Sequence, residues 1–79
     1  MKKFDLVNKP QTRFYRKKTT VELAFINEPF KVDTQEGEMF ISPETVDDWD
    51  NGYYIAYPDD ASKPYAISPA YVRQNYEPV

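Results

Sequence analysis

Hydrophobic and polar residues alternate most clearly in two segments of the chain, and each segment predicts a β-strand with one apolar face. The first segment spans residues 19–25, and its apolar face consists of Val21, Leu23 and Phe25. The second spans residues 53–57, and its apolar face consists of Tyr53, Ile55 and Tyr57. These are the two clearest strand signals in the chain.

Shorter apolar segments around them predict further strands. Residues 13–16 form either a separate strand or the first part of a long bent one with residues 19–26. Residues 30–32 and 38–41 flank a polar turn at Asp33–Gly37, where Gly37 is expected at positive φ, and Met39 and Ile41 are expected to face inward. Residues 58–63 resemble a hairpin connection into residues 64–67, and residues 76–79 are expected to be extended.

Two Ser-Pro pairs predict short helices, because serine is a good N-cap and proline is favoured at the first helical position. Ser42-Pro43-Glu44 predicts one or two turns ending by Trp49, and Ser68-Pro69 predicts a short helix over residues 70–75. The sum is four to six short strands with one or two helical turns. The predicted class is mainly β with minor α, as a small antiparallel β-roll or open barrel.

The length of 79 residues predicts one small domain covering residues 1–79. Residues 1–11 are expected to form an arm, flexible or docked, because Pro10 interrupts regular structure. Phe4, Leu6 and Val7 are the residues that could dock it on the core, with Phe4 and Leu6 at a spacing of two.

The composition is informative about function mainly because two residue types are absent. The chain has no His and no Cys, so it lacks the usual general base, the thiol nucleophile and the commonest zinc ligands. We therefore expect a non-enzymatic protein without a cofactor or bound metal. It has no apolar run of membrane-spanning length and no signal-peptide pattern, which predicts a location in the cytoplasm without membrane attachment.

Charge is distributed unevenly along the chain. Residues 1–18 contain seven Lys or Arg and one Asp, whereas residues 19–60 contain eleven Asp or Glu and one Lys. This separation makes the chain strongly dipolar along its sequence.

Several short motifs follow one another in a fixed order over residues 13–79. They are Tyr15-Arg16-Lys17-Lys18, Val21-Glu22, Glu36-Gly37-Glu38-Met39, Ile41-Ser42-Pro43, Gly52-Tyr53-Tyr54-Ile55, Pro64-Tyr65, Ser68-Pro69 and Asn75-Tyr76-Glu77-Pro78-Val79. In this order they resemble a family of small, mostly uncharacterised proteins of tailed phages and prophages. The resemblance implies a phage origin and a role in the host cytoplasm during infection, and it brings no catalytic residues. Residues 44–51 are an insertion relative to that pattern.

Two surfaces are candidates for partner binding. The first is an acidic cluster around a tryptophan, which would anchor the chain on a host protein with a basic surface. It consists of Asp47, Asp48, Trp49, Asp50, Asp59 and Asp60. In the alternative interpretation Trp49 is a core residue and the aspartates are solvated.

The second candidate is a basic strand with interleaved aromatics, which would bind nucleic acid. It consists of Arg13, Tyr15, Arg16, Lys17 and Lys18. The low isoelectric point of about 4.8 argues against a dedicated nucleic-acid-binding protein. The leading hypothesis is a phage accessory protein that binds and modulates or inhibits a host protein; a nucleic-acid-binding module and a minor virion or assembly component are the alternatives.

Overall fold

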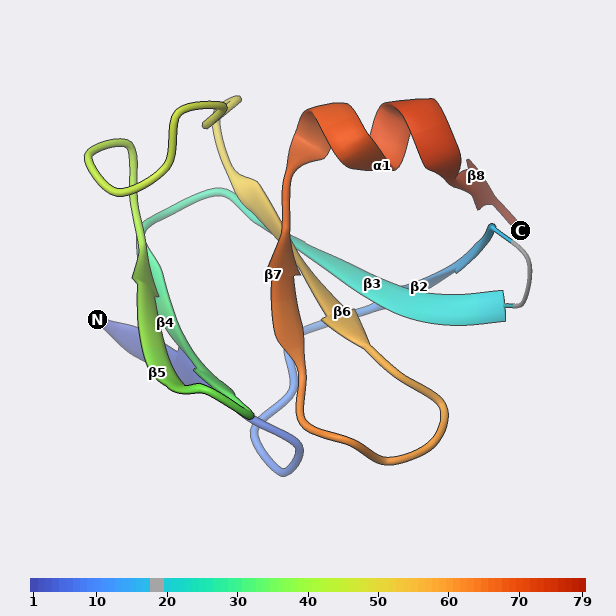
Figure 1. Ribbon diagram of the computed structural model, residues 1–79, viewed down its shortest axis with the longest axis horizontal. Helices are drawn as coiled ribbons and strands as arrows, with labels where there is room; N and C mark the ends of the chain where they lie inside the picture. Colours follow the sequence, from blue (N-terminus) through green and yellow to red (C-terminus); the bar gives the residue numbers. More distant parts are fainter. Residues whose placement is uncertain (18–19) are drawn as a thin grey trace.

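The structure is a computed structural model that describes residues 1–17 and 20–79, and it consists of two β-sheets and one short helix (Figure 1). Sheet I has the strand order β1-β4-β5, and sheet II has the order β7-β6-β3-β2-β8. The strands are β1 (Lys2–Phe4), β2 (Arg13–Arg16), β3 (Thr20–Ile26), β4 (Phe30–Thr34), β5 (Gly37–Ile41), β6 (Tyr53–Tyr57), β7 (Tyr65–Ile67) and β8 (Glu77–Pro78), and the helix is α1 (Pro69–Asn75). The described strands form two sheets that are not closed into a barrel, which confirms the mainly β class.

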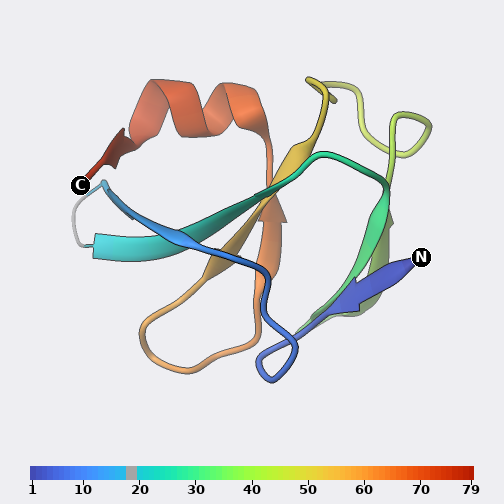
Figure 2. The same cartoon turned by 180° about the vertical axis from the view of Figure 1, so that it is seen from behind.

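Strand β3 is the centre of sheet II. It pairs antiparallel with β2 on one side and with β6 on the other, and β8 adds to the outer edge of β2. In sheet I, β4 pairs antiparallel with β5 and parallel with β1. Seen from behind, β1 lies beside β4 at the end of the molecule away from the C-terminus (Figure 2). Alternation within a strand gives no information about such a parallel pairing, and the sequence did not predict it.

Sheet II has buried side chains on both faces, since successive side chains of a strand point to opposite sides. The face towards sheet I forms the main core, and the other face forms a smaller second core beneath α1. The main core contains Phe4, Ala24, Ile26, Phe30, Val32, Ile41, Tyr53, Ile55 and Tyr57. The second core contains Leu23, Ala56, Ile67 and Val72. Each large side chain buried in this way contributes roughly 1.5–3 kcal/mol.

Many of the predicted elements are confirmed. Tyr53, Ile55 and Tyr57 are all buried on one face of β6, and β2 is a separate strand. Helix α1 begins after Ser68, whose Oγ accepts a hydrogen bond of 3.1 Å from the backbone N–H of Tyr71.

The helix predicted after Ser42-Pro43 is wrong. The backbone forms a single turn there, in which Thr45 and Val46 donate to the Ser42 carbonyl. The Thr45 side chain competes for the same backbone, since its Oγ1 accepts from the Ser42 N–H and donates to the Ser42 carbonyl. The chain then turns so that Val46 and Trp49 pack on the main core.

Four side chains expected to pack inward or dock are more exposed than the sequence suggested. Met39 is 42% exposed, because it lies where sheet II no longer covers β5. Phe25 shares the face of Leu23 but is 46% exposed, since it lies beyond the second core. In the N-terminal segment Phe4 is buried, whereas Leu6 and Val7 follow the end of β1 and are 42% and 95% exposed.

Gly52 is required by close packing at the start of β6. Its φ is +152°, and a Cβ there would lie 2.4 Å from Cζ of Phe25 and 2.5 Å from the carbonyl oxygen of Ile26. Gly37, at the β4–β5 turn, has the predicted positive φ of +107°, but nothing lies within 4 Å of an added Cβ.

We therefore expect Gly52→Ala to lower the free energy of unfolding by about 3 kcal/mol, because it combines overpacking with backbone strain. Gly37→Ala is the matched control and should cost about 1 kcal/mol, from strain alone. Urea denaturation followed by circular dichroism measures both. Equal losses in the two variants would contradict the proposed contact between residue 52 and Phe25.

The Tyr57 side chain places a buried hydroxyl in the main core. The side chain is 3% exposed, and its hydroxyl has no hydrogen-bond partner among the described residues. Burial, with smaller contributions from the charges of Asp5 and Glu22, raises the pKa of Tyr57 to about 12. An unfolded tyrosine has a pKa of about 10, so the unfolded chain ionises first as the pH rises.

The contribution of Tyr57 to stability should thus be complete below pH 10 and lost between about pH 10 and 12. We expect Tyr57→Phe to keep or raise the free energy of unfolding at pH 7, by up to about 1 kcal/mol, because it removes an unpaired buried hydroxyl. The same variant should show a shallower loss of stability above pH 10. A variant clearly less stable than wild type at pH 7 would show that the hydroxyl is bonded.

Candidate binding surfaces

The acidic segment lies in the connection between β5 and β6. Trp49 is half-buried and packs against the main core together with Val46, whereas Asp47, Asp48 and Asp50 are exposed. The segment therefore presents carboxylates to the surface while its tryptophan contributes to packing.

Each neighbouring carboxylate has its own environment. Asp50 accepts a hydrogen bond of 2.9 Å from Nη1 of Arg73 on α1. Asp48 interacts with Tyr53, whose pKa is raised first by burial and then by the charge and hydrogen bond of Asp48. No three carboxylates among residues 1–17 and 20–79 come together as a metal site.

The other two predicted members of the acidic cluster lie elsewhere. Asp59 and Asp60 are in the β6–β7 connection, at the opposite end of β6 from Asp48 (Figure 1). Asp60 accepts hydrogen bonds from the N–H and hydroxyl of Ser62, which lower its pKa. The sequence placed these carboxylates in one cluster around Trp49, and the extended strand β6 keeps them apart.

The basic strand is divided as well. Arg13 and Tyr15 point to the α1 side of sheet II, while Arg16 points to the other side because side chains alternate along β2. Lys17 is held at α1, where its Nζ donates to the Tyr71 hydroxyl at 2.5 Å and lies 4.8 Å from the centre of that ring. Lys18 lies outside the described residues. The predicted basic residues do not form a single stripe.

Three tyrosines converge beside α1 on what we call the tyrosine surface, defined by Tyr65, Tyr71 and Tyr76. Tyr65 and Tyr71 are each 42% exposed, and the ring centres of Tyr71 and Tyr76 are 6.1 Å apart. Burial, and next the charge and hydrogen bond of Tyr65, raise the pKa of Tyr76 to about 12. The residue pattern did not place these three together, because their convergence depends on how the consecutive elements β7 and α1 pack.

Two depressions adjoin the tyrosine surface, and each includes one of the predicted aspartates. A depression of about 540 Å³ lies between Asp48 and the three tyrosines. A second, of about 310 Å³, lies between Asp59, Tyr65 and Tyr76. Asp48 and Asp59, which the sequence placed in one acidic cluster, therefore lie at the two ends of the tyrosine surface.

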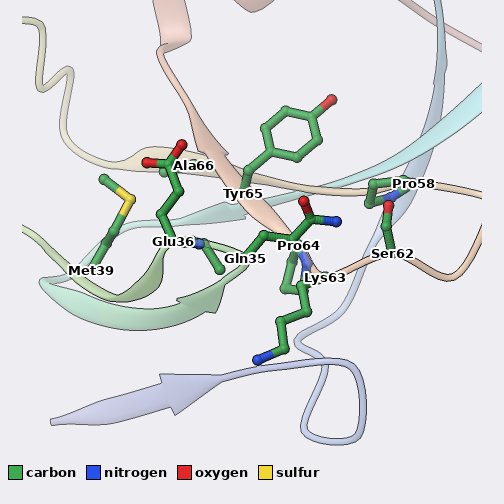
Figure 3. A pocket seen from close by; sticks show the side chains of 10 residues that line it. Gln35, Glu36, Met39, Pro58, Ser62, Lys63, Pro64, Tyr65 and Ala66 are labelled. Carbon is green, nitrogen blue, oxygen red and sulfur yellow. The ribbon is translucent and has the colours of Figure 1, made fainter.

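A groove opens between the turn of β4–β5 and the β6–β7 connection (Figure 3). It measures about 360 Å³, with Met39 and Glu36 on one side and Tyr65 and Pro58 on the other. Lys63 points away from Tyr65 and forms an ion pair of 3.2 Å with Asp33. Because Tyr65 borders this groove too, the groove extends the tyrosine surface towards β5.

A separate aromatic surface lies on the part of sheet II that the second core leaves open. It consists of Arg13, Tyr15, Phe25 and Tyr54, and we call it the open aromatic face. Sequence analysis identified Arg13 and Tyr15 but missed Phe25 and Tyr54. Phe25 and Tyr54 could have been grouped from the pairing of β3 with β6, which places Phe25 directly opposite Tyr54.

Comparison with known proteins adds no relative. No family model, curated protein or solved structure matches the chain. Within the described part of the chain, no helix is long and apolar enough to cross a membrane. The fold thus defines a small two-sheet β protein with one helix, and the resemblance to phage proteins stays a prediction from the motifs.

The packing of Trp49 can be tested directly. We expect Trp49→Ala to lower the free energy of unfolding by about 2 kcal/mol, less than the roughly 3–5 kcal/mol for a fully buried aromatic ring. Asp47→Asn, on an exposed neighbour, should change it by less than about 0.5 kcal/mol. Tryptophan fluorescence in the wild type should be blue-shifted relative to the unfolded chain. A stability loss no greater than that of Asp47→Asn would instead mark Trp49 as a free surface anchor.

Proposed function

We propose that the chain is a phage-encoded, non-enzymatic accessory protein that binds a host protein in the host cytoplasm and modulates or inhibits it. The ordered motifs from Tyr15 to Val79 support the phage origin. The absence of His and Cys from the sequence supports a binding role over catalysis.

The observation that carries the proposal is the tyrosine surface with an aspartate at each end. Tyrosine is enriched at protein-binding hot spots, because its ring gives a large contact area and its hydroxyl tolerates water. Tyr65, Tyr71 and Tyr76 meet on one surface, and partial burial holds Tyr76 in place. Such a preorganised surface loses little side-chain freedom on binding.

The tyrosine surface is bordered by two carboxylates and by one cation, Lys17, which lines both depressions and donates to the Tyr71 hydroxyl. The two carboxylates are the charges that favour a basic partner. Asp48 and Asp59 border its two depressions, and neither forms an ion pair among the described residues. Carboxylates at the rim of an interface steer a partner with a cationic surface and set its orientation. In this proposal Asp48 and Asp59 take the role that the sequence gave to the whole acidic cluster, and Trp49 supports the loop from below.

The test is recovery of a host protein from lysate by the tagged chain. We expect wild type to retain a specific protein and the double variant Tyr65→Ala/Tyr71→Ala to lose at least tenfold of it, because the hot-spot contacts are removed. Asp48→Asn/Asp59→Asn should weaken recovery most at low salt, where rim charges matter most. Circular dichroism checks that each variant is folded.

Phe14→Ala is the matched control, since Phe14 is 54% exposed on the opposite face of sheet II. It should recover the same protein as wild type. Equal recovery by the tyrosine variant and wild type would remove the tyrosine surface from the proposal, and no specific recovery by wild type would count against the function itself.

A further inference from the structure

The open aromatic face is a row of rings on an exposed part of a sheet. The ring centres of Phe25 and Tyr54 are 5.1 Å apart, and those of Tyr54 and Tyr15 are 6.1 Å apart. These rings, with Gln11, Arg13 and Leu23, line a depression of about 360 Å³. Phe25 is 46% exposed, so part of its ring is available to a ligand.

The rings are held in fixed positions by their surroundings. Phe25 lies against the backbone of Gly52 at a distance that leaves no room for a Cβ. Tyr54 packs against the rings of Phe25 and Tyr15, edge-on to the latter, and burial raises the pKa of Tyr54. A ligand that stacks here therefore meets a preformed surface and does not have to order these side chains.

The depression carries a single type of charge. Arg13 is its only charged lining residue and forms no ion pair among the described residues. Arg73 also acts on Tyr54, but Asp50 neutralises it at 2.9 Å. The complementary ligand is therefore planar and apolar in one part and anionic in another.

We propose that the open aromatic face binds single-stranded nucleic acid, with bases stacked on Phe25 and Tyr54 and a backbone phosphate bound by Arg13. This site goes beyond the proposed function, since its residues are distinct from the tyrosine surface. A single strand fits because its bases expose their faces, whereas paired bases in a duplex are already stacked on each other.

The charge of the whole molecule sets the conditions for binding. The net charge of −3 repels phosphates at long range, so affinity depends on stacking and on one local contact. Binding should therefore be strongest at low salt, where the contact with Arg13 is least screened, and it should fall as counterions compete for the phosphate.

The experiment is fluorescence anisotropy of a short labelled oligo-dT titrated with the full chain at low and at rising salt. Phe25→Ala should weaken binding by about fivefold or more, because base stacking is lost. Arg13→Ala should weaken it and lower the slope of log K against log salt by about one, because one phosphate contact is lost. Arg13 is exposed, so its replacement leaves the fold intact and keeps the test valid even if Phe25→Ala is unstable.

The strand β2 supplies a matched control for each change. Phe14 and Arg16 lie on the opposite face of the same strand and are exposed. Phe14→Ala and Arg16→Ala should leave the affinity within about twofold of wild type. Absence of binding at low salt would overturn the proposal, as would equal effects of the control variants, or equal binding of a duplex. None of these outcomes depends on the host-protein pull-down, so the two proposals can fail separately.

Discussion

The ladder between β3 and β6 is the constraint on which the rest of the structure depends. Five residue pairs, from Glu22–Tyr57 to Ile26–Tyr53, hold the two strands in register. Both strands have buried side chains on both faces, so this register assigns each of these side chains to one core or the other. A shift by one residue would exchange the two faces and place Ile55 beneath α1 instead of in the main core.

The rest of the chain covers the two faces of this ladder. Sheet I covers one face, and α1 covers part of the other through Val72. A helix of seven residues is only about 10 Å long, so it cannot cover the whole face. The neighbours of Val72 point to either side: Tyr71 joins the tyrosine surface, and Arg73 reaches Asp50 near Tyr54. Both proposed binding surfaces therefore exist because the cover on this side is short.

The sequence predicted those parts of the fold that depend on local signals. The alternation in residues 53–57 was sufficient to predict β6, and the Ser68 cap was sufficient to predict α1, since each signal depends on neighbouring residues alone. The same Ser-Pro signal failed at Ser42, because the Thr45 side chain and the packing of Trp49 compete with helix formation there. The parallel β1–β4 pair depends on a contact between distant segments. The convergence of the three tyrosines depends on how the consecutive elements β7 and α1 pack, and no local pattern records either arrangement.

The uneven charge along the sequence is explained in part by folding. Cations of the N-terminal segment pair with acids from the middle of the chain, at distances from 2.7 to 3.7 Å, in the pairs Lys3–Glu38, Lys9–Glu22 and Lys2–Glu28. Exposed pairs of this kind contribute about 1 kcal/mol or less each, but together they favour docking of β1 and the following loop. The charges that carry the binding proposals are among those that this pairing leaves over: Arg13 on the open aromatic face, and Asp48 and Asp59 beside the tyrosine surface. A run of like charges in the sequence is thus a poor guide to a binding site until its internal partners have been assigned.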